Sequence, residues 1–218
     1  MKDVAYKYLE GRYLEALLNG DIYLNSYSNI RRLEKKKMDE LIGDQHEGLG
    51  LNKVGCLFID PSLPNNNKNI ENLRKAGGSN FTGGARGIII GGKYTRETND
   101  AWMFCASCER NDAYWMEQSG YDKCIKINDV FQLFERCAIE LEKEYKMRSS
   151  WGDCKYEEIW GVVDNGIVNE PSYYRKSELF KSQKERRLVF EPFQENASRN
   201  LQPKVIKIKV DDLLEPLN

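Results

Sequence analysis

Apolar and polar residues alternate in short stretches along this chain, and a period of two residues is typical of half-buried β-strands. Over residues 4–9 the alternation places Val4, Tyr6 and Tyr8 on one face and their neighbours on the other. The same alternation, or a short apolar run, predicts further strands over residues 22–27, 55–59, 88–90, 101–107, 124–127, 156–163 and 204–210. Lysines flank the last of these, as is common for a strand at the edge of a sheet.

Apolar residues at a spacing of three to four predict the helices. The longest covers residues 130–147, where Phe131, Phe134 and Leu141 fall on one face and Asp129 precedes it as the N-cap. Shorter helices are predicted over residues 12–19, 29–37 and 113–117, the last with Asp112 as its cap. The elements therefore predict the α+β class, with a central mixed or antiparallel sheet flanked by helices.

The chain has 218 residues, which is enough for one sizeable core and short for two. It contains no internal repeat and no linker, so residues 1–218 are predicted to form a single domain. Its least regular part, residues 61–92, holds an asparagine run and three glycine pairs that fit neither dinucleotide-binding nor P-loop patterns. We expect a mobile Gly/Asn-rich insertion at about residues 61–95, either a substrate lid or a simple insertion.

Acidic and basic residues are almost balanced, at 34 and 33, so no global positive field argues for nucleic acid. Local basic runs occur at residues 31–37 and at Arg186 and Arg187, and such runs are most often solvated surface. The first residues carry no apolar run of the kind that a signal peptide needs, and no stretch has the length of a membrane span. These features predict a cytoplasmic protein without a membrane partner.

Six cysteines are present, and without an export signal we expect them to be reduced. Cys105 and Cys108 form a CxxC pair, but no second pair follows and His46 is the single histidine. Buried strand thiols are therefore favoured over a zinc site. His46 lies between Asp44 and Glu47, where a catalytic base and an ordinary loop histidine are both open interpretations.

Residues 180–190 combine an aromatic ring, an amide, a carboxylate and two guanidinium groups before an apolar strand that ends at Phe190. A carboxylate held at the start of a rigid strand is well placed to act on a substrate. A polar turn that leads into a strand is also an ordinary surface feature, and this alternative stays open.

Short segments spread over most of the chain form a recognisable series. In chain order they are Tyr6-Lys7-Tyr8, residues 18–26, residues 44–48, Phe104-Cys105-Ala106-Ser107 with the later Trp115, and residues 183–188. Together they resemble a bacterial domain-of-unknown-function family, number 2971. Two positions depart from that family's closing motif, because Gln183 stands in place of a Glu and Arg186 in place of an aromatic residue. The family implies a class of domain rather than a reaction.

The order of three features also resembles the ADP-ribosyltransferase fold. They are a first strand with Lys7 between two tyrosines, a middle strand with Ser107 after Phe104, and a late strand opened by Gln183-x-Glu185. The resemblance implies that Glu185 and Gln183 are catalytic and that Phe180 recognises the target. It further implies that NAD is bound by Tyr6, Lys7, Tyr8, Ser107 and Arg187. Lysine in place of arginine at position 7 is a departure, since an ammonium group does not reproduce a bidentate contact with phosphate.

Such an enzyme uses NAD as its substrate, as a transferase or an NAD glycohydrolase, and the resemblance implies a bacterial toxin or anti-phage defence effector with an unidentified target. Two other classes remain open. One is a nucleic-acid-acting or nucleic-acid-binding module that draws on the basic runs and the twelve tyrosines. The other is a non-catalytic protein-interaction domain. Binding that weakens steeply with salt would indicate the nucleic-acid class, and release of nicotinamide would indicate the enzyme.

Overall fold

A computed structural model describes residues 3–37, 49–59, 71, 87–118, 120–158, 160–162, 172–193 and 200–217. The chain divides into two compact units. Unit 1 comprises Met1–Gln45, Asn99–Lys155 and Leu179–Asn218, and unit 2 comprises His46–Thr98 and Tyr156–Glu178. The single domain expected from the sequence stays a prediction.

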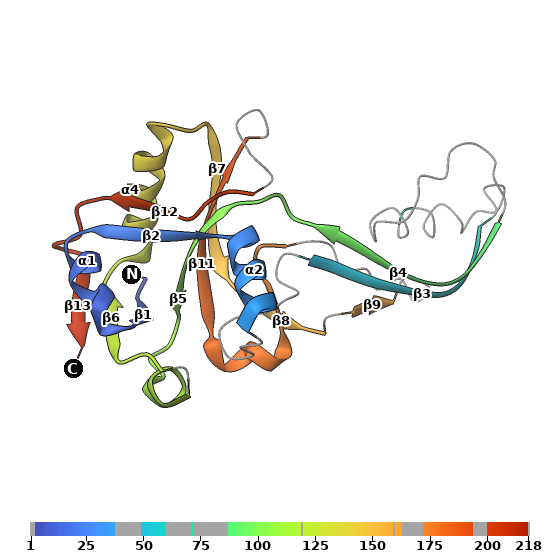
Figure 1. The fold of residues 1–218 in the computed structure, drawn as a ribbon, viewed down its shortest axis with the longest axis horizontal. Coiled ribbons are helices and arrows are strands. Elements are labelled where there is room, and N and C mark those ends of the chain that lie inside the picture. The colour runs from blue at the N-terminus through green and yellow to red at the C-terminus, as the bar shows by residue number, and fades with distance from the viewer. Residues whose placement is uncertain are drawn as a thin grey trace. The chain divides into compact units, whose positions relative to one another are not determined.

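The described part of unit 1 forms an eight-stranded sheet in which every strand pair is antiparallel (Figure 1). The main path runs β12-β2-β5-β1-β6-β13, while β11 pairs with β5 and β7 pairs with β11. The α+β class with a large antiparallel sheet is therefore confirmed. The strands are β1 (Ala5–Leu9), β2 (Asp21–Ser26), β5 (Trp102–Ser107), β6 (Lys123–Ile127), β7 (Met147–Asp153), β11 (Glu185–Pro192), β12 (Lys204–Lys207) and β13 (Leu214–Leu217).

Strand β5 is the centre of this sheet. One of its edges pairs with β11 over its whole length, from Trp102 to Ser107. Its other edge is shared, because β2 pairs with it at Trp102 and Met103 whereas β1 pairs with it at Ser107. The sheet therefore forks along β5, and Ser107 stands between β1 and β11.

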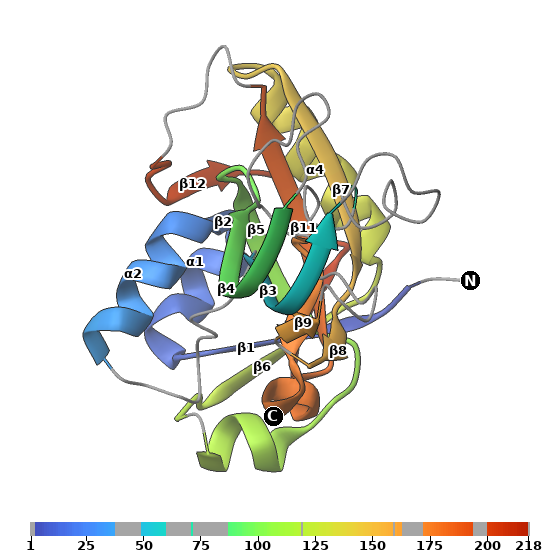
Figure 2. The ribbon, with the colours of Figure 1, turned by 90° about the vertical axis from the view of Figure 1, so that its right-hand side faces the viewer.

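The helical elements of unit 1 lie on both faces of the sheet (Figure 2). Their bounds are η1 (Gly11–Tyr13), α1 (Leu14–Leu18), α2 (Tyr27–Lys37), the π-helix η2 (Ala113–Gln118) and α4 (Val130–Glu142), and η4 (Glu178–Gln183) precedes β11. Helix α4 packs on one face and α2 begins on the other. None of the helices that the structure describes is long and apolar enough to cross a membrane.

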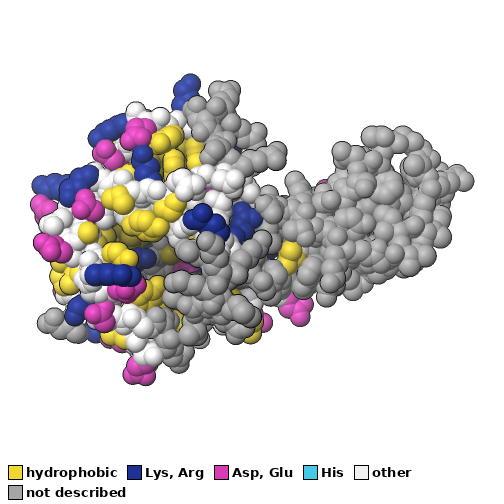
Figure 3. Space-filling view, in the orientation of Figure 1, with side chains coloured by type: hydrophobic (Ala, Val, Ile, Leu, Met, Phe, Trp, Pro, Cys, Tyr) yellow, Lys and Arg dark blue, Asp and Glu magenta, His cyan; other side chains and the backbone are white. Residues whose placement is uncertain are grey.

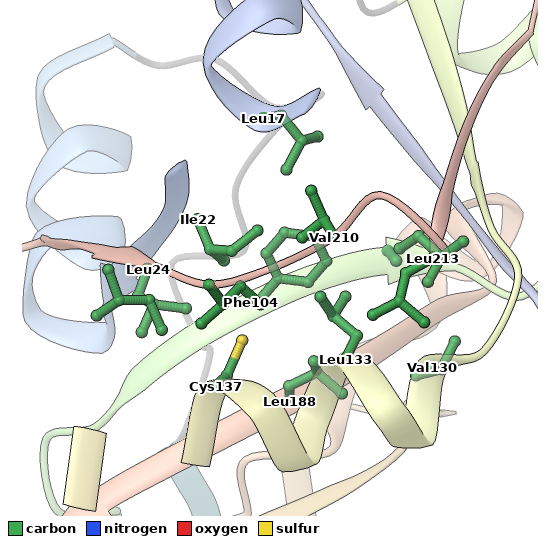
Figure 4. Close-up of a cluster of buried hydrophobic side chains, with 14 of the residues drawn as sticks. Leu17, Ile22, Leu24, Phe104, Val130, Leu133, Cys137, Leu188, Val210 and Leu213 are labelled. Atoms are coloured by element: carbon green, nitrogen blue, oxygen red, sulfur yellow. The ribbon is translucent and has the colours of Figure 1, made fainter. Parts of the chain in front are cut away.

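Helix α4 supplies the main core. Val130, Leu133, Cys137 and Leu141 are buried at its inner face, and Figure 4 shows three of these side chains directed toward Phe104 and its neighbours. Further side chains of this core come from β2, β5, β6 and β11. The helical spacing that predicts this element thus matches the face that it buries.

The predicted helix over residues 130–147 is too long at its C-terminal end. Helix α4 ends at Glu142, and Met147 already begins β7. Tyr145 still packs against the core, with its ring 4.9 Å from that of Trp102, so the apolar spacing continues beyond the helix. Strand β7 is absent from the sequence prediction because its residues do not alternate, and pairing with β11 defines it.

Unit 2 contains a three-stranded sheet of β3 (Leu49–Ile59), β4 (Gly87–Glu97) and β9 (Trp160–Val162). Strand β3 pairs antiparallel with β4 and parallel with β9, and β8 (Lys155–Glu157) pairs with β10 (Arg175–Ser177). The single strand predicted over residues 156–163 is therefore two short strands.

The predicted irregular segment of residues 61–92 extends too far. Gly87 to Gly92 belong to β4, which contains the short strand predicted over residues 88–90 and continues past it, with Gly92 paired to Val54. Pairing with a partner strand can thus extend a short apolar run into flanking glycines. Residues 60–70 and 72–86, with most of the predicted insertion, lie outside the described residues, as does His46.

The N-cap of α4 contributes a measurable part of the stability of this helix. The Asp129 side chain accepts a hydrogen bond from the main-chain N–H of Gln132 at 3.1 Å. Replacing Asp129 with Ala removes this bond, and we expect the free energy of unfolding to fall by about 1 kcal/mol. Asp129→Ser keeps an oxygen at the cap and should recover most of the loss. Urea unfolding followed by circular dichroism measures both, and an unchanged midpoint for Asp129→Ala would contradict the capping role.

Candidate functional site

Three side chains of the predicted site lie in one row across three neighbouring strands. Glu185, the first residue of β11, pairs with Ser107 of β5. Ser107 in turn pairs with Tyr6 of β1. Paired residues of antiparallel strands point to the same face of the sheet. The fork at β5 therefore brings together residues that lie 101 and 78 positions apart in the sequence (107 − 6 and 185 − 107).

The carboxylate of Glu185 is buried and ion-paired. Its side chain is 7% exposed and accepts a hydrogen bond of 2.6 Å from the Nε of Arg187, which has no exposed surface. Two positions apart on one strand, both side chains point to the same face. The Nη1 of Arg187 donates to the hydroxyl of Tyr27 at 2.9 Å. Because a buried guanidinium is costly without an anion, this pair favours the ionised carboxylate.

Ser107 fastens the turn that precedes Glu185. Its Oγ lies 2.9 Å from the main-chain oxygen of Gln183 and 2.7 Å from that of Glu109. The main-chain N–H of Cys108 donates to the oxygen of Lys184 at 2.7 Å. Ser107 is only 2% exposed. In this structure the hydroxyl therefore holds the end of β5 against the start of β11.

Gln183 and Phe180 are not arranged as the resemblance implies. Gln183 ends η4, and the φ of Lys184 is +44°, so Gln183 does not share a strand face with Glu185. A left-handed residue breaks the alternation that places positions two apart on one face. Gln183 is 1% exposed, and its Nε2 donates to the hydroxyl of Tyr114 at 3.3 Å. Phe180 is also buried, so its ring is not presented to a target.

Lys7 points to the opposite face of the sheet from Glu185. Its ammonium donates to the main-chain oxygen of Cys105 at 2.8 Å and lies 4.9 Å from the ring centre of Phe104, a core residue. Burial lowers the pKa of the Lys7 ammonium, and the charges of Cys105 and Glu185 act in the other direction. Lys7 is thus bound within the protein rather than directed toward a phosphate site.

Tyr8 supports the π-helix η2. Its hydroxyl donates to Asp112 at 2.7 Å and accepts from the main-chain N–H of Asn111 at 2.8 Å, and its ring stacks on Trp115 with centroids 5.6 Å apart. The cap of this element is Asn111, whose side chain accepts from the N–H of Tyr114, rather than the predicted Asp112. The Asp112 carboxylate instead accepts the hydrogen bond from the Tyr8 hydroxyl.

The second guanidinium of the motif points away from Glu185. Arg186 pairs in register with Asp153 of β7, contacts that carboxylate with its Nε at 2.5 Å, and forms a further ion pair with Asp3. Cys108 donates to Asp153 at 3.3 Å, and burial together with that carboxylate raises the pKa of its thiol to about 12. Cys108 is therefore not a nucleophile at neutral pH. Among the described residues no three metal-ligating side chains come together.

Tyr27 and Tyr114 make polar contacts in this site that the sequence pattern does not predict. Tyr27 lies at the junction of a predicted strand and a predicted helix, 160 positions from Arg187. Tyr114 lies in a short predicted helix. The apolar residues of that helix predict that it packs against the protein, but they do not predict a polar contact. No local pattern relates either tyrosine to the motif at residues 183–187, so only the sheet topology reveals these contacts.

The buried pair predicts an unequal response to two changes at one position. Glu185→Ala leaves the guanidinium of Arg187 buried without an anion, and we expect a loss of about 3–5 kcal/mol in the free energy of unfolding. Glu185→Gln keeps an oxygen for the Nε–H of Arg187, so the loss should be smaller, about 1–3 kcal/mol.

Chemical denaturation measures both losses, and Glu191→Ala on the same strand is the control. Glu191 accepts a hydrogen bond from Asn99 at the protein surface, so its removal should cost less than about 1 kcal/mol. Equal losses for Glu185→Ala and Glu191→Ala would contradict the buried ion pair.

Comparison of the chain with protein-family models, with curated proteins and with solved structures finds no match. The resemblance to family 2971 and to the ADP-ribosyltransferase layout therefore stays a prediction.

Proposed function

We propose that this chain is an NAD-using, ADP-ribosyltransferase-like enzyme, either a transferase or an NAD glycohydrolase that acts inside bacterial cells. The observation that best supports the proposal is the row of Glu185, Ser107 and Tyr6 across β11, β5 and β1. The order of these residues along the chain resembles the ADP-ribosyltransferase layout. The pairing register of their strands supports the proposal, because it brings the three residues close together. Membership of family 2971 is part of the same proposal.

The proposed reaction breaks the bond between C1′ of the ribose and the nitrogen of nicotinamide. The bonding electrons leave with nicotinamide, positive charge develops on the ribose, and an acceptor oxygen or nitrogen then attacks C1′ and loses its proton. In the glycohydrolase the acceptor is water. A fixed carboxylate that accepts a hydrogen bond from a ribose hydroxyl stabilises the developing charge. Glu185 suits this role, because Arg187 restrains its carboxylate from one side.

Other residues take roles that their surroundings allow. Tyr6 is half-buried beside Ser107 and offers a ring for the nicotinamide. Gln183 is assigned to holding the turn before β11, through Tyr114, rather than to the acceptor. Lys7 receives no phosphate-binding role. Since the Glu185 side chain is only 7% exposed, NAD binding must make this face of the sheet more accessible.

A nucleic-acid-binding surface has less support. Such a surface needs cations that are not neutralised by neighbouring carboxylates. On the face seen in Figure 3, basic and acidic side chains are interspersed. Many of the basic residues that the structure describes in unit 1 are ion-paired, as in Arg12–Glu10, Lys126–Glu215, Arg136–Asp212, Lys204–Glu144 and Lys207–Asp21.

The proposal predicts that the chain releases nicotinamide from NAD and that Glu185→Gln lowers the turnover by on the order of a hundredfold or more. The physical reason is the loss of the negative charge of Glu185 beside the ribose. Chromatographic measurement of free nicotinamide, with water or a bacterial lysate as the source of acceptor, checks the result. Glu191→Gln, a change of the same kind on the same strand, should leave the turnover within about twofold of wild type.

Wild-type protein that releases no nicotinamide under either condition, or a Glu185→Gln variant that is folded and fully active, would overturn the proposal. A non-catalytic interaction domain would then be the better account. Circular dichroism of each variant separates loss of catalysis from loss of fold.

A further inference from the structure

A buried chain of hydrogen bonds joins the start of α2 to the carboxylate of Glu185. Tyr27, the first residue of α2, is completely buried, and its hydroxyl accepts a hydrogen bond from Arg187 Nη1 at 2.9 Å. Arg187 in turn donates from Nε to Glu185 at 2.6 Å. Burial makes each of these contacts costly to break, because the separated groups have little access to water.

Two contacts on different nitrogens fix the orientation of a guanidinium group. The group is planar, and its donors point in set directions. The bond from Nε to Glu185 constrains one edge of this plane. The second bond, from Nη1 to Tyr27, selects one orientation of the plane and hence the direction from which Arg187 approaches the carboxylate.

Tyr27 is itself held in place by the main chain around it. Its N–H donates to the oxygen of Ala101 at 3.2 Å, immediately before β5. The N–H of Ser28 donates to the Asp100 carboxylate at 3.1 Å, and the same carboxylate accepts from the N–H of Leu201 at 2.7 Å. The first turn of α2 is thus fixed to the segments that lead into β5 and β12.

We propose that Tyr27 is a positioning residue for Glu185, which acts by holding the Arg187 guanidinium in the orientation that restrains the carboxylate. Tyr27 itself does not touch the substrate. The catalytic consequence of this inference rests on the proposed NAD-using function, whereas the coupling between Tyr27 and Arg187 does not.

The test compares Tyr27→Phe with wild type in two independent measurements. The first is nitrogen-15 NMR of the arginine side chains, with Arg187 assigned from the signal lost in Arg187→Lys. In wild type the Nε–H of Arg187 should exchange slowly with water and rotation of its Nη groups should be restricted. Without the hydroxyl of residue 27, exchange of the Nε–H should become about tenfold faster or more, the scale of one lost hydrogen bond.

The second measurement is the rate of nicotinamide release. Because Tyr27 orients the carboxylate without binding NAD, Tyr27→Phe should lower kcat by about tenfold and leave KM within about twofold of wild type. The matched control is Tyr145→Phe, which removes a hydroxyl that accepts a hydrogen bond from Lys204 at 3.5 Å, away from the site. The control should change neither the Arg187 signal nor kcat.

The outcomes separate the two proposals. Unchanged Arg187 exchange in a folded Tyr27→Phe variant overturns the positioning role, whatever the activity. Absence of nicotinamide release from wild type overturns the proposed function, while the NMR comparison still decides the coupling. If Tyr27→Phe does not fold, the wild-type spectrum decides, because fast exchange at Nε and free rotation at Nη1 would contradict a guanidinium held by both partners.

Discussion

The buried guanidinium of Arg187 is the group on which the candidate site depends. Its side chain has no exposed surface, so its charge must be met inside the protein. The Glu185 carboxylate balances that charge, and the Tyr27 hydroxyl accepts a hydrogen bond from a second nitrogen of the guanidinium. The same contacts that compensate Arg187 also fix the carboxylate, and stability and positioning are therefore two consequences of one interaction.

Strand β5 makes this arrangement possible because its two edges serve different partners. Its long pairing with β11 sets Glu185 opposite Ser107, and its short pairing with β1 sets Tyr6 on the other side. Helix α4 packs on one face of this sheet, where Phe134 stacks on Phe190 of β11 with ring centroids 5.7 Å apart. Alternation along β11 then leaves Glu185 and Arg187 on the opposite face, where α2 begins.

Local pattern was sufficient for much of the fold. The alternation around Tyr6, the apolar run before Ser107 and the helical spacing after Asp129 each reflect burial of one face, which depends only on near neighbours in sequence. The same logic failed at residue 147, because Tyr145 continues the apolar spacing although the helix has ended. Strand β7 is ordered by its pairing with β11, and no local signal encodes that pairing.

The site was predicted in part for a similar reason. Proximity of Glu185 and Ser107 follows from the expected order of strands, whereas the contact from Arg187 to Tyr27 depends on where α2 begins. The shared face expected for Gln183 and Glu185 was wrong, because the left-handed Lys184 interrupts the strand period. Lys7 faces the core because its strand alternates in step with Ala5 and Leu9.

The most direct test of the account is a crystal structure with a non-hydrolysable NAD analogue. The account predicts a ribose hydroxyl within hydrogen-bond distance of the Glu185 carboxylate, about 2.5–3.0 Å, with Arg187 still on its other side. An analogue bound elsewhere, with Glu185 still buried and ion-paired with Arg187, would contradict a catalytic role and leave the pair as a structural feature of the sheet.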